Sequence, residues 1–154
     1  MSREQAEEKI VADVAEYGWH VMNVFAEEGR PGFSYSIGLS VTFRHPEIIL
    51  FGLRSETAHQ LINLVGNAVQ EGKSFEDGSV SSDFLSGYDC VFLSVPRRFY
   101  EDYLGFGLWF YGEESFPVLQ LVYPDRNGHW PWEPEAGEGF RQAQPVLADG
   151  VLPS

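Results

Sequence analysis

The stretch Phe33–Phe43, FSYSIGLSVTF, alternates without exception between apolar or aromatic residues at odd positions and small or polar residues at even positions. A period of two places the odd-numbered side chains on one face of an extended chain, whereas a helix has a period of 3.6. We therefore predict a β-strand over the whole stretch, with one face buried. Such a strand either lies at the centre of its own sheet or pairs with its equivalent in a homodimer.

The residues before this stretch predict a helix and a hairpin. Apolar residues recur at three- and four-residue steps over Ser2–Tyr17, which is typical of an amphipathic helix. Trp19–Ala26 is rich in β-branched and aromatic residues and predicts a strand. The Gly- and Pro-containing turn Glu27–Gly32 is short, so we expect this strand to pair antiparallel with the central one.

The residues after it alternate between apolar runs and helical patterns, starting from a break at Arg44–Pro46. We predict strands at Glu47–Leu53, Tyr88–Val95 and Phe116–Tyr123, helices at Glu56–Gln70 and Arg97–Tyr111, and a loop or weak hairpin at Lys73–Gly87. The last residues, 135–154, predict a mostly irregular tail, in which Gln144–Leu147 can dock as an edge strand. This order predicts a single α+β domain over residues 1–154, with a largely antiparallel sheet of about five strands packed with two or three helices.

The charge of the chain is strongly negative. Its 23 acidic and 10 basic residues give a net charge of −13, and Arg97–Arg98 is the only adjacent basic pair. Nucleic acid is itself densely negative, so this balance disfavours nucleic-acid binding. An acidic surface keeps a protein soluble and can also steer it to a basic protein partner.

The N-terminal and cysteine patterns favour a cytoplasmic protein. The first ten residues are charged and lack the apolar core of a secretory signal, and no apolar run reaches the length of a membrane span. Cys90 is the only cysteine, so no internal disulfide can form. It lies within an apolar strand pattern, which favours a small core residue over a reactive thiolate.

Four residues are weak candidates for a metal site. His45 and Glu47 share one face of an extended segment, and Asp125 and His129 flank a turn near the C-terminus. Imidazole and carboxylate together bind divalent metals, but this spacing matches no closed metal signature. His59 falls at a surface position of its predicted helix. The alternative interpretation is that His45 only completes the entry of its strand.

Aromatic residues near the C-terminus are candidates for a binding patch. Tryptophan and tyrosine combine apolar area with a hydrogen-bond donor, which suits binding sites. The candidates for a concave ligand or partner site are Tyr35, Gln120, Tyr123, Asp125, Trp130 and Trp132. The alternative is that the two tryptophans close the core as a C-terminal plug.

Several motifs, in order, resemble the DUF4262 family. They are Gly18-Trp19, FSYSIGL at Phe33–Leu39, HPE at His45–Glu47, FGL at Phe51–Leu53, LQLVYPD at Leu119–Asp125 with Gly128, PWE at Pro131–Glu133 and QP at Gln144-Pro145. The resemblance runs from about residue 10 to residue 147 and implies a compact bacterial domain of unknown function. It supplies no catalytic residue, cofactor or partner. It also implies that HPE and the PD…PWE segment form one functional surface.

These patterns favour a non-enzymatic binding or regulatory module over an enzyme. In this hypothesis the acidic chain binds a basic protein partner or a ligand through the His45–Glu47 loop and the Asp125–Trp132 segment. The alternative is a small enzyme, or a metal- or cofactor-binding protein, whose site is formed by His45, Glu47, Asp125 and His129. A third hypothesis, a barrel-like flavin binder, rests on the strand-rich pattern by analogy alone.

Overall fold

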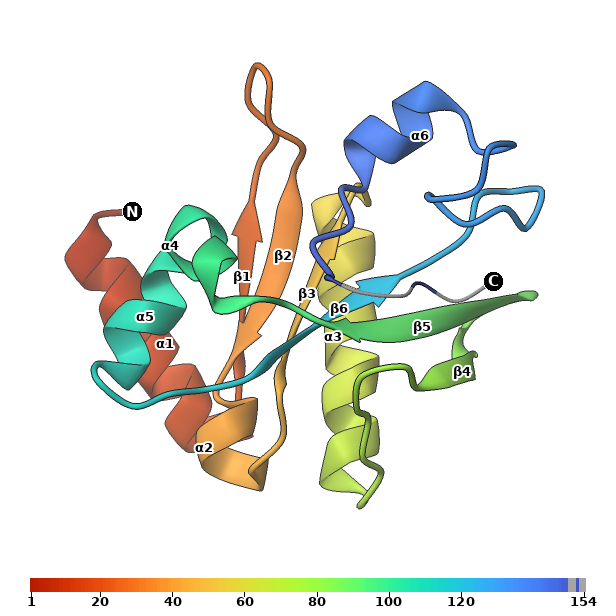
Figure 1. Ribbon diagram of the computed structural model, residues 1–154. Coiled ribbons are helices and arrows are strands. Elements are labelled where there is room, and N and C mark those ends of the chain that lie inside the picture. The colour runs from red at the N-terminus through yellow and green to blue at the C-terminus, as the bar shows by residue number, and fades with distance from the viewer. Residues whose placement is uncertain (150–151, 153–154) are drawn as a thin grey trace.

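The computed structural model describes residues 1–149 and 152, and they form one six-stranded sheet with helices on both faces (Figure 1). The α+β class is therefore confirmed. The strands are β1 (His20–Val24), β2 (Phe33–Ile37), β3 (Glu47–Phe51), β4 (Val80–Leu85), β5 (Tyr88–Ser94) and β6 (Val118–Val122). The helices are α1 (Arg3–Tyr17), α2 (Leu39–Phe43), α3 (Ser55–Gln70), the 3-10 turn η1 (Arg97–Phe99), α4 (Tyr100–Tyr103), α5 (Gly105–Tyr111) and α6 (Glu138–Ala143).

The sheet is mixed and has six strands, and the described residues form six α-helices, so the expectation of a largely antiparallel sheet of about five strands with two or three helices is wrong. Its order is β1-β2-β3-β6-β5-β4. The two antiparallel halves meet at a parallel pair, β3 and β6, in which Glu47 lies opposite Val118. The sixth strand is β4, which lies inside the segment Lys73–Gly87 that was expected to be a loop or weak hairpin, and it pairs antiparallel with β5. The described strands form an open sheet with β1 and β4 at its edges, which removes the basis of the barrel analogy.

The strand expected over Phe33–Phe43 ends at Ile37. Gly38 adopts φ 122°, and the chain turns there into the short helix α2. A β-carbon at Gly38 would lie 2.6 Å from the Gly18 carbonyl oxygen. The turn therefore requires glycine both for its positive φ and for its lack of a side chain. The remaining strand, β2, is buried on both faces and lies between β1 and β3. It has no free edge with which to pair in a dimer.

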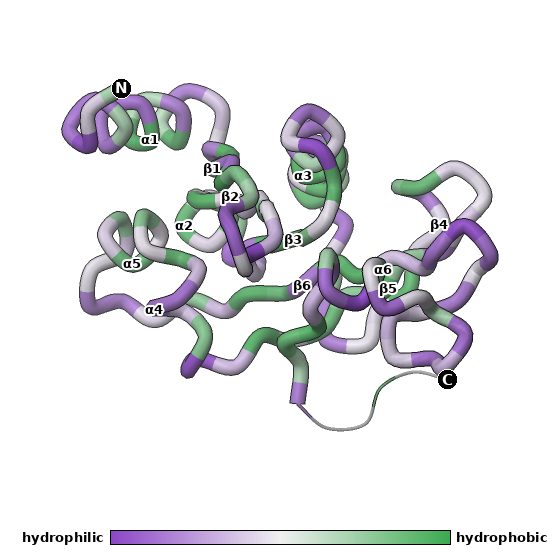
Figure 2. The backbone as a smooth tube through the Cα atoms, turned by 90° about the horizontal axis from the view of Figure 1, so that it is seen from above, coloured by the Kyte–Doolittle hydropathy of each residue, from purple (hydrophilic) through white to green (hydrophobic). Residues whose placement is uncertain are grey.

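The two faces of the sheet are covered by different parts of the chain (Figure 2). Helix α3 covers one face, where Ile62 and Val65 pack against Leu50 and Leu121. On the other face, α1, α4 and α5 cover the β2–β3 half. The β5–β6 half of that face is covered by the C-terminal segment, including Trp130 and Trp132.

Two further segments differ from the sequence expectation. The helix expected over Arg97–Tyr111 is divided into η1, α4 and α5, with a break at Leu104. The C-terminal tail, expected to be mostly irregular, has one short helix, α6, among its described residues and docks through buried glutamine side chains. Gln144 makes two hydrogen bonds to the backbone of Tyr123, and Gln120 holds the backbone of Pro145 and Leu147. The tail therefore docks through side chains, without forming the expected edge strand.

No helix among the described residues is both long and apolar enough to cross a membrane.

Candidate functional site

His45 is a buried structural residue with both ring nitrogens paired. Its side chain is 4% exposed. Nδ1 donates to the Pro46 carbonyl oxygen at 2.9 Å, and Nε2 accepts from the Phe75 backbone N–H at 2.9 Å. Burial lowers the pKa of His45, partly opposed by its hydrogen bond to Pro46. The ring is therefore neutral and fixes the loop before β4, so it is not available to an external ligand.

Glu47 is a fully buried carboxylate surrounded by donors. It accepts hydrogen bonds from the Ser36 hydroxyl at 2.7 Å and from the Tyr111 hydroxyl. It also accepts from the first backbone N–H groups around α2, at Gly38, Leu39 and Ser40. Burial raises the pKa of Glu47, and these hydrogen bonds oppose the rise. Its role is to hold the start of α2 against β3 and α5.

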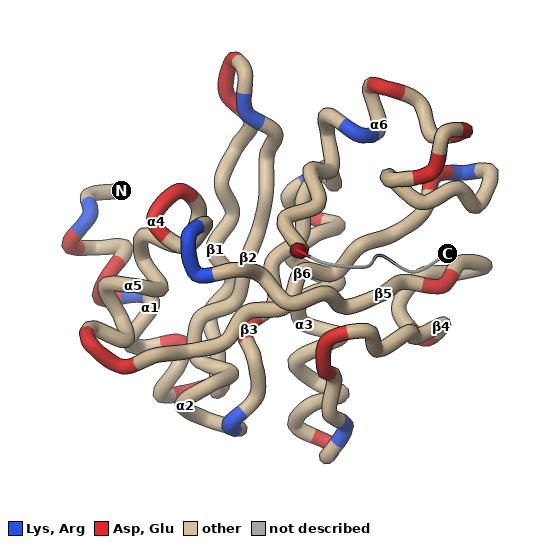
Figure 3. The backbone as a smooth tube through the Cα atoms, in the orientation of Figure 1, with Lys and Arg blue, Asp and Glu red and all other residues tan. Residues whose placement is uncertain are grey.

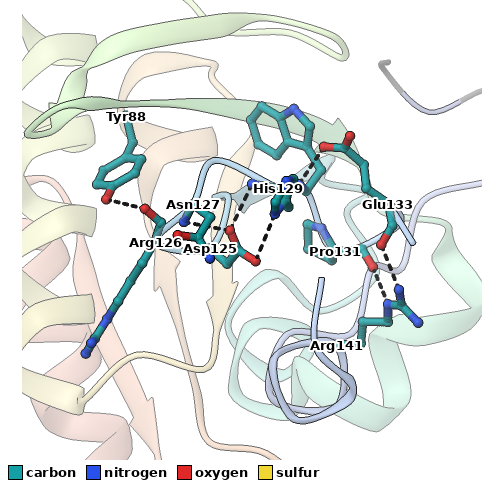
Figure 4. Close-up of polar contacts among 9 residues, drawn as sticks. Tyr88, Asp125, Arg126, Asn127, His129, Pro131, Glu133 and Arg141 are labelled. Atoms are coloured by element: carbon teal, nitrogen blue, oxygen red, sulfur yellow. Dashed lines mark hydrogen bonds and ion pairs between the residues drawn. The ribbon is translucent and has the colours of Figure 1, made fainter. Parts of the chain in front are cut away.

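The Asp125 segment is a self-contained turn (Figure 4). One Asp125 oxygen accepts from the backbone N–H groups of Asn127 and His129, both at 2.9 Å. These bonds, from His129 first, lower the pKa of Asp125. The other oxygen lies 3.7 Å from His129 Nδ1. The Asp125 carboxylate is thus occupied in shaping its own loop.

The next turn is closed by Glu133 and Arg141. The Glu133 carboxylate accepts from the Trp130 backbone N–H at 2.8 Å, and Arg141 donates to the carbonyl oxygens of Pro131 and Glu133 (Figure 4). Trp130 and Trp132 stack with ring centroids 5.4 Å apart and cover the β5–β6 half of the sheet. This arrangement is the C-terminal plug that the sequence left as an alternative.

The four weak metal candidates do not meet. Glu47 begins β3 opposite Val118, the first residue of β6, whereas Asp125 follows the far end of β6, beyond the other end of this parallel pair of strands. Seven residues separate Val118 from Asp125, which corresponds to roughly 20 Å at about 3.3 Å per extended residue. The described residues contain no group of three or more histidine, cysteine, aspartate or glutamate side chains arranged to hold a metal ion.

The aromatic candidates are also distributed over separate clusters. Tyr35 packs under α4 and α5, and burial raises its pKa to about 12. Tyr123 lies in the cluster under α3 and donates to the Phe51 carbonyl oxygen at 2.7 Å. Gln120 is fully buried beneath the tail. The concave patch expected from the sequence is therefore absent, since its members belong to different layers. Cys90 is buried too, and burial raises its thiol pKa to about 12.

One surface cleft lies between the β1–β2 hairpin and the start of α3. Its volume is about 1060 Å³, and its far wall includes Gln142 of α6. The charged residues along it are two of each sign, Glu27 and Glu56 against Arg30 and Arg54. This balance gives the cleft no preference for a ligand of either charge.

A second hollow, between α1 and α5, is strongly acidic. We call it the acidic groove; its lining residues are Glu4, Glu7, Glu8, Val11, Ala12 and Trp109. Val11 is 52% exposed and Trp109 is 38% exposed, so its floor presents apolar surface to solvent. Glu7 pairs with Arg3 at 3.1 Å, whereas Glu4 and Glu8 form no ion pair with any described residue. Figure 3 shows further acidic residues nearby, at α4 and in the connection between α5 and β6.

The comparisons with known proteins identify a family. The family described as "Domain of unknown function (DUF4262)" matches residues 13–137. The chain belongs to this family, which confirms the resemblance seen in its motifs. No curated protein and no solved structure matches the chain.

Proposed function

We propose that this chain is an acidic binding module that recognises a basic segment of a partner protein. The observation that carries the proposal is the acidic groove, where exposed apolar side chains lie beside glutamates without ion-pair partners. An arginine or lysine side chain can stack on the Trp109 ring while its charge faces Glu4 and Glu8. The net charge of −13 adds long-range attraction for such a partner.

This proposal keeps the basic partner expected from the sequence but moves the contact surface. His45 and Glu47 are at most 4% exposed and cannot touch a partner in this structure. The groove formed by α1 and α5 offers exposed apolar and acidic groups together, as a docking surface requires. A cytoplasmic location is part of the same proposal.

Binding of a fluorescent arginine-glycine repeat peptide, followed by anisotropy, tests the proposal. We expect Trp109→Ala to weaken binding about fivefold to tenfold, because it removes the aromatic face without changing the net charge. The double change Glu4→Gln, Glu8→Gln should weaken binding further, and most strongly at low salt.

The matched control is Glu27→Gln with Glu28→Gln, which makes the same charge change in the β1–β2 turn, away from the groove. If this control weakens binding as much as the groove variant, the attraction comes from net charge alone and the proposed site is wrong. Unchanged binding by Trp109→Ala also contradicts the proposal.

A further inference from the structure

The side of α1 away from the acidic groove faces a second groove, which contains two histidines. It lies between α1 and α3, beside the edge strand β1, and has a volume of about 820 Å³. His20 comes from β1 and His59 from α3. Burial is the main cause that lowers the pKa of His20, and an electrostatic contribution from His59 adds to it, so the two rings are within electrostatic reach of each other. Neither residue takes part in the function proposed above.

The hydrogen bonds of the two rings determine where their protons lie. His20 Nδ1 is 2.7 Å from an Asp13 carboxylate oxygen, which can only accept, so Nδ1 carries the proton. His59 Nδ1 is 3.1 Å from Asn23 Nδ2. The other Asn23 atom, Oδ1, accepts from the buried Ser34 hydroxyl at 2.7 Å, which orients the amide so that its N–H donates to His59.

The neutral rings therefore have opposite tautomers. His20 has its lone pair on Nε2, and His59 has its proton on Nε2. Neither Nε2 atom has a hydrogen-bond partner within the described part of the chain. Neither of them is among the buried polar atoms that lack a partner. Both atoms are thus open to the solvent in the groove. Burial lowers the pKa of His20, opposed by its bond to Asp13, which favours the neutral ring at neutral pH.

The remaining walls favour an uncharged, hydroxyl-bearing ligand. Asn63 uses its carbonyl oxygen to accept from Trp19 Nε1 at 3.0 Å, which leaves its N–H groups for a ligand. Lys9 is paired with Asp13 at 3.3 Å, so its charge is already compensated, and Glu16, the remaining charged side chain of the lining, disfavours an anionic ligand. Tyr17 is 61% exposed at the rim and offers the face of an aromatic ring. Amides and an aromatic face together match the hydroxyls and the apolar face of a sugar ring.

We propose that the groove between α1 and α3 is a binding site for a small neutral saccharide. His20 Nε2 accepts a hydrogen bond from one ligand hydroxyl, and His59 Nε2–H donates to another ligand oxygen. Asp13 and Asn23 are positioning residues, because each holds one ring in the required tautomer.

Nitrogen-15 NMR of the imidazole rings in the full chain tests the proposal in two steps. In the free protein we expect the proton on Nδ1 of His20 and on Nε2 of His59. The probes are glucose, galactose, mannose, ribose and N-acetylglucosamine, added separately at millimolar concentration. We expect at least one of them to shift both ring signals. Other tautomers, or no shift with any probe, would overturn the proposal.

Variants separate a binding role from a structural one. Asp13→Ala removes the acceptor of the His20 Nδ1–H bond, so it should move the His20 proton toward Nε2 and weaken binding of the sugar that shifts both rings, while the spectrum remains that of a folded protein. His59→Gln should weaken that binding about tenfold, as expected for the loss of one good hydrogen bond. His129→Gln is the matched control, since His129 lies in the Asp125 turn, and it should leave binding unchanged. Equal weakening by the control, or unchanged binding in His59→Gln, contradicts the proposal.

Discussion

At the scale of single residues, Glu47 connects more of the chain than any motif indicated. Its carboxylate joins β2, the start of α2, and α5 through Ser36, three backbone N–H groups and Tyr111. All of these neighbours donate, so a carboxylate satisfies them and an amide cannot. The polar residues of HPE were visible in the sequence, but their role was not, because Tyr111 is 64 residues away from Glu47.

Glu47→Gln should lower the free energy of unfolding by about 3 kcal/mol or more, because the new amide N–H₂ faces buried donors. Urea denaturation measures this loss. Glu113→Gln, an exposed change of the same kind, should stay within about 0.5 kcal/mol of the original protein. A loss below about 1 kcal/mol in Glu47→Gln would show that the donors find other partners.

Separation in sequence also hid the roles of the other candidate site residues. The sequence indicated Gln120, Tyr123 and Asp125 as candidates for a binding patch, and in the structure each of them makes hydrogen bonds within the fold. Their partners, such as Pro145 for Gln120 and Phe51 for Tyr123, are distant in sequence and could not be identified from it. The His20–Asp13 pair was missed, although Asp13 is on a helix and His20 lies only two residues after the glycine cap of that helix, a local signal that was available.

At the scale of elements, periodicity located most helices and strands, and it failed where a turn was set by tertiary contacts. The alternation over Phe33–Phe43 continues past Ile37, but Gly38 and the Glu47 carboxylate turn the chain into α2. Helix α3, with its clear apolar face, matches its prediction closely. Period alone cannot show where a strand is interrupted by contacts from elsewhere in the chain.

The packing of α3 on Trp19, the residue just before β1, depends on Gly66. A β-carbon there would lie 2.5 Å from the Trp19 ring. Gly66→Ala should therefore destabilise the protein by about 1–2 kcal/mol, although alanine is the better helix former by roughly 1 kcal/mol. Thermal unfolding followed by circular dichroism measures the change.

Gly139→Ala in α6 is the control for this prediction, because a β-carbon at Gly139 meets nothing within 4 Å. This change should be neutral or stabilising. A Gly66→Ala protein as stable as the original would mean that Trp19 moves aside without cost.

At the scale of the whole molecule, length and charge predicted one acidic domain and the order of strand and helix patterns predicted the α+β class, but neither predicted the sheet topology. Nothing local to β3 or β6 shows that they are parallel neighbours, because the pairing depends on the path of every element between them. The three-layer arrangement, in which the tail covers part of one face of the sheet, also depends on the path of the whole chain and not on any local pattern.

The stability of the whole molecule should depend on pH through His45. Its pKa is lowered in the fold, so below about 6.5, the ordinary value, the unfolded chain binds more protons at this position. The stabilisation is present above that pH and is lost as the pH falls toward the lowered pKa. The loss is at most about 1.4 kcal/mol per pH unit.

Urea denaturation at pH 7.5 and pH 5.5 checks this prediction. Between the two, the original protein should lose more stability than His45→Gln, which has no imidazole to protonate at this position. Because His20 and the buried Glu47 also titrate, the two proteins are compared by their pH slopes and not by their absolute stabilities. Parallel slopes would show that His45 does not contribute.

The central position of β6 has a consequence for biosynthesis. This strand joins the two halves of the sheet, yet it is made after all the other strands. A nascent chain that ends before Val118 can form the β1–β3 and β4–β5 halves, but it leaves the inner edges of β3 and β5 unpaired. The period in which the growing chain is exposed to wrong strand pairing therefore ends only when its central strand leaves the ribosome.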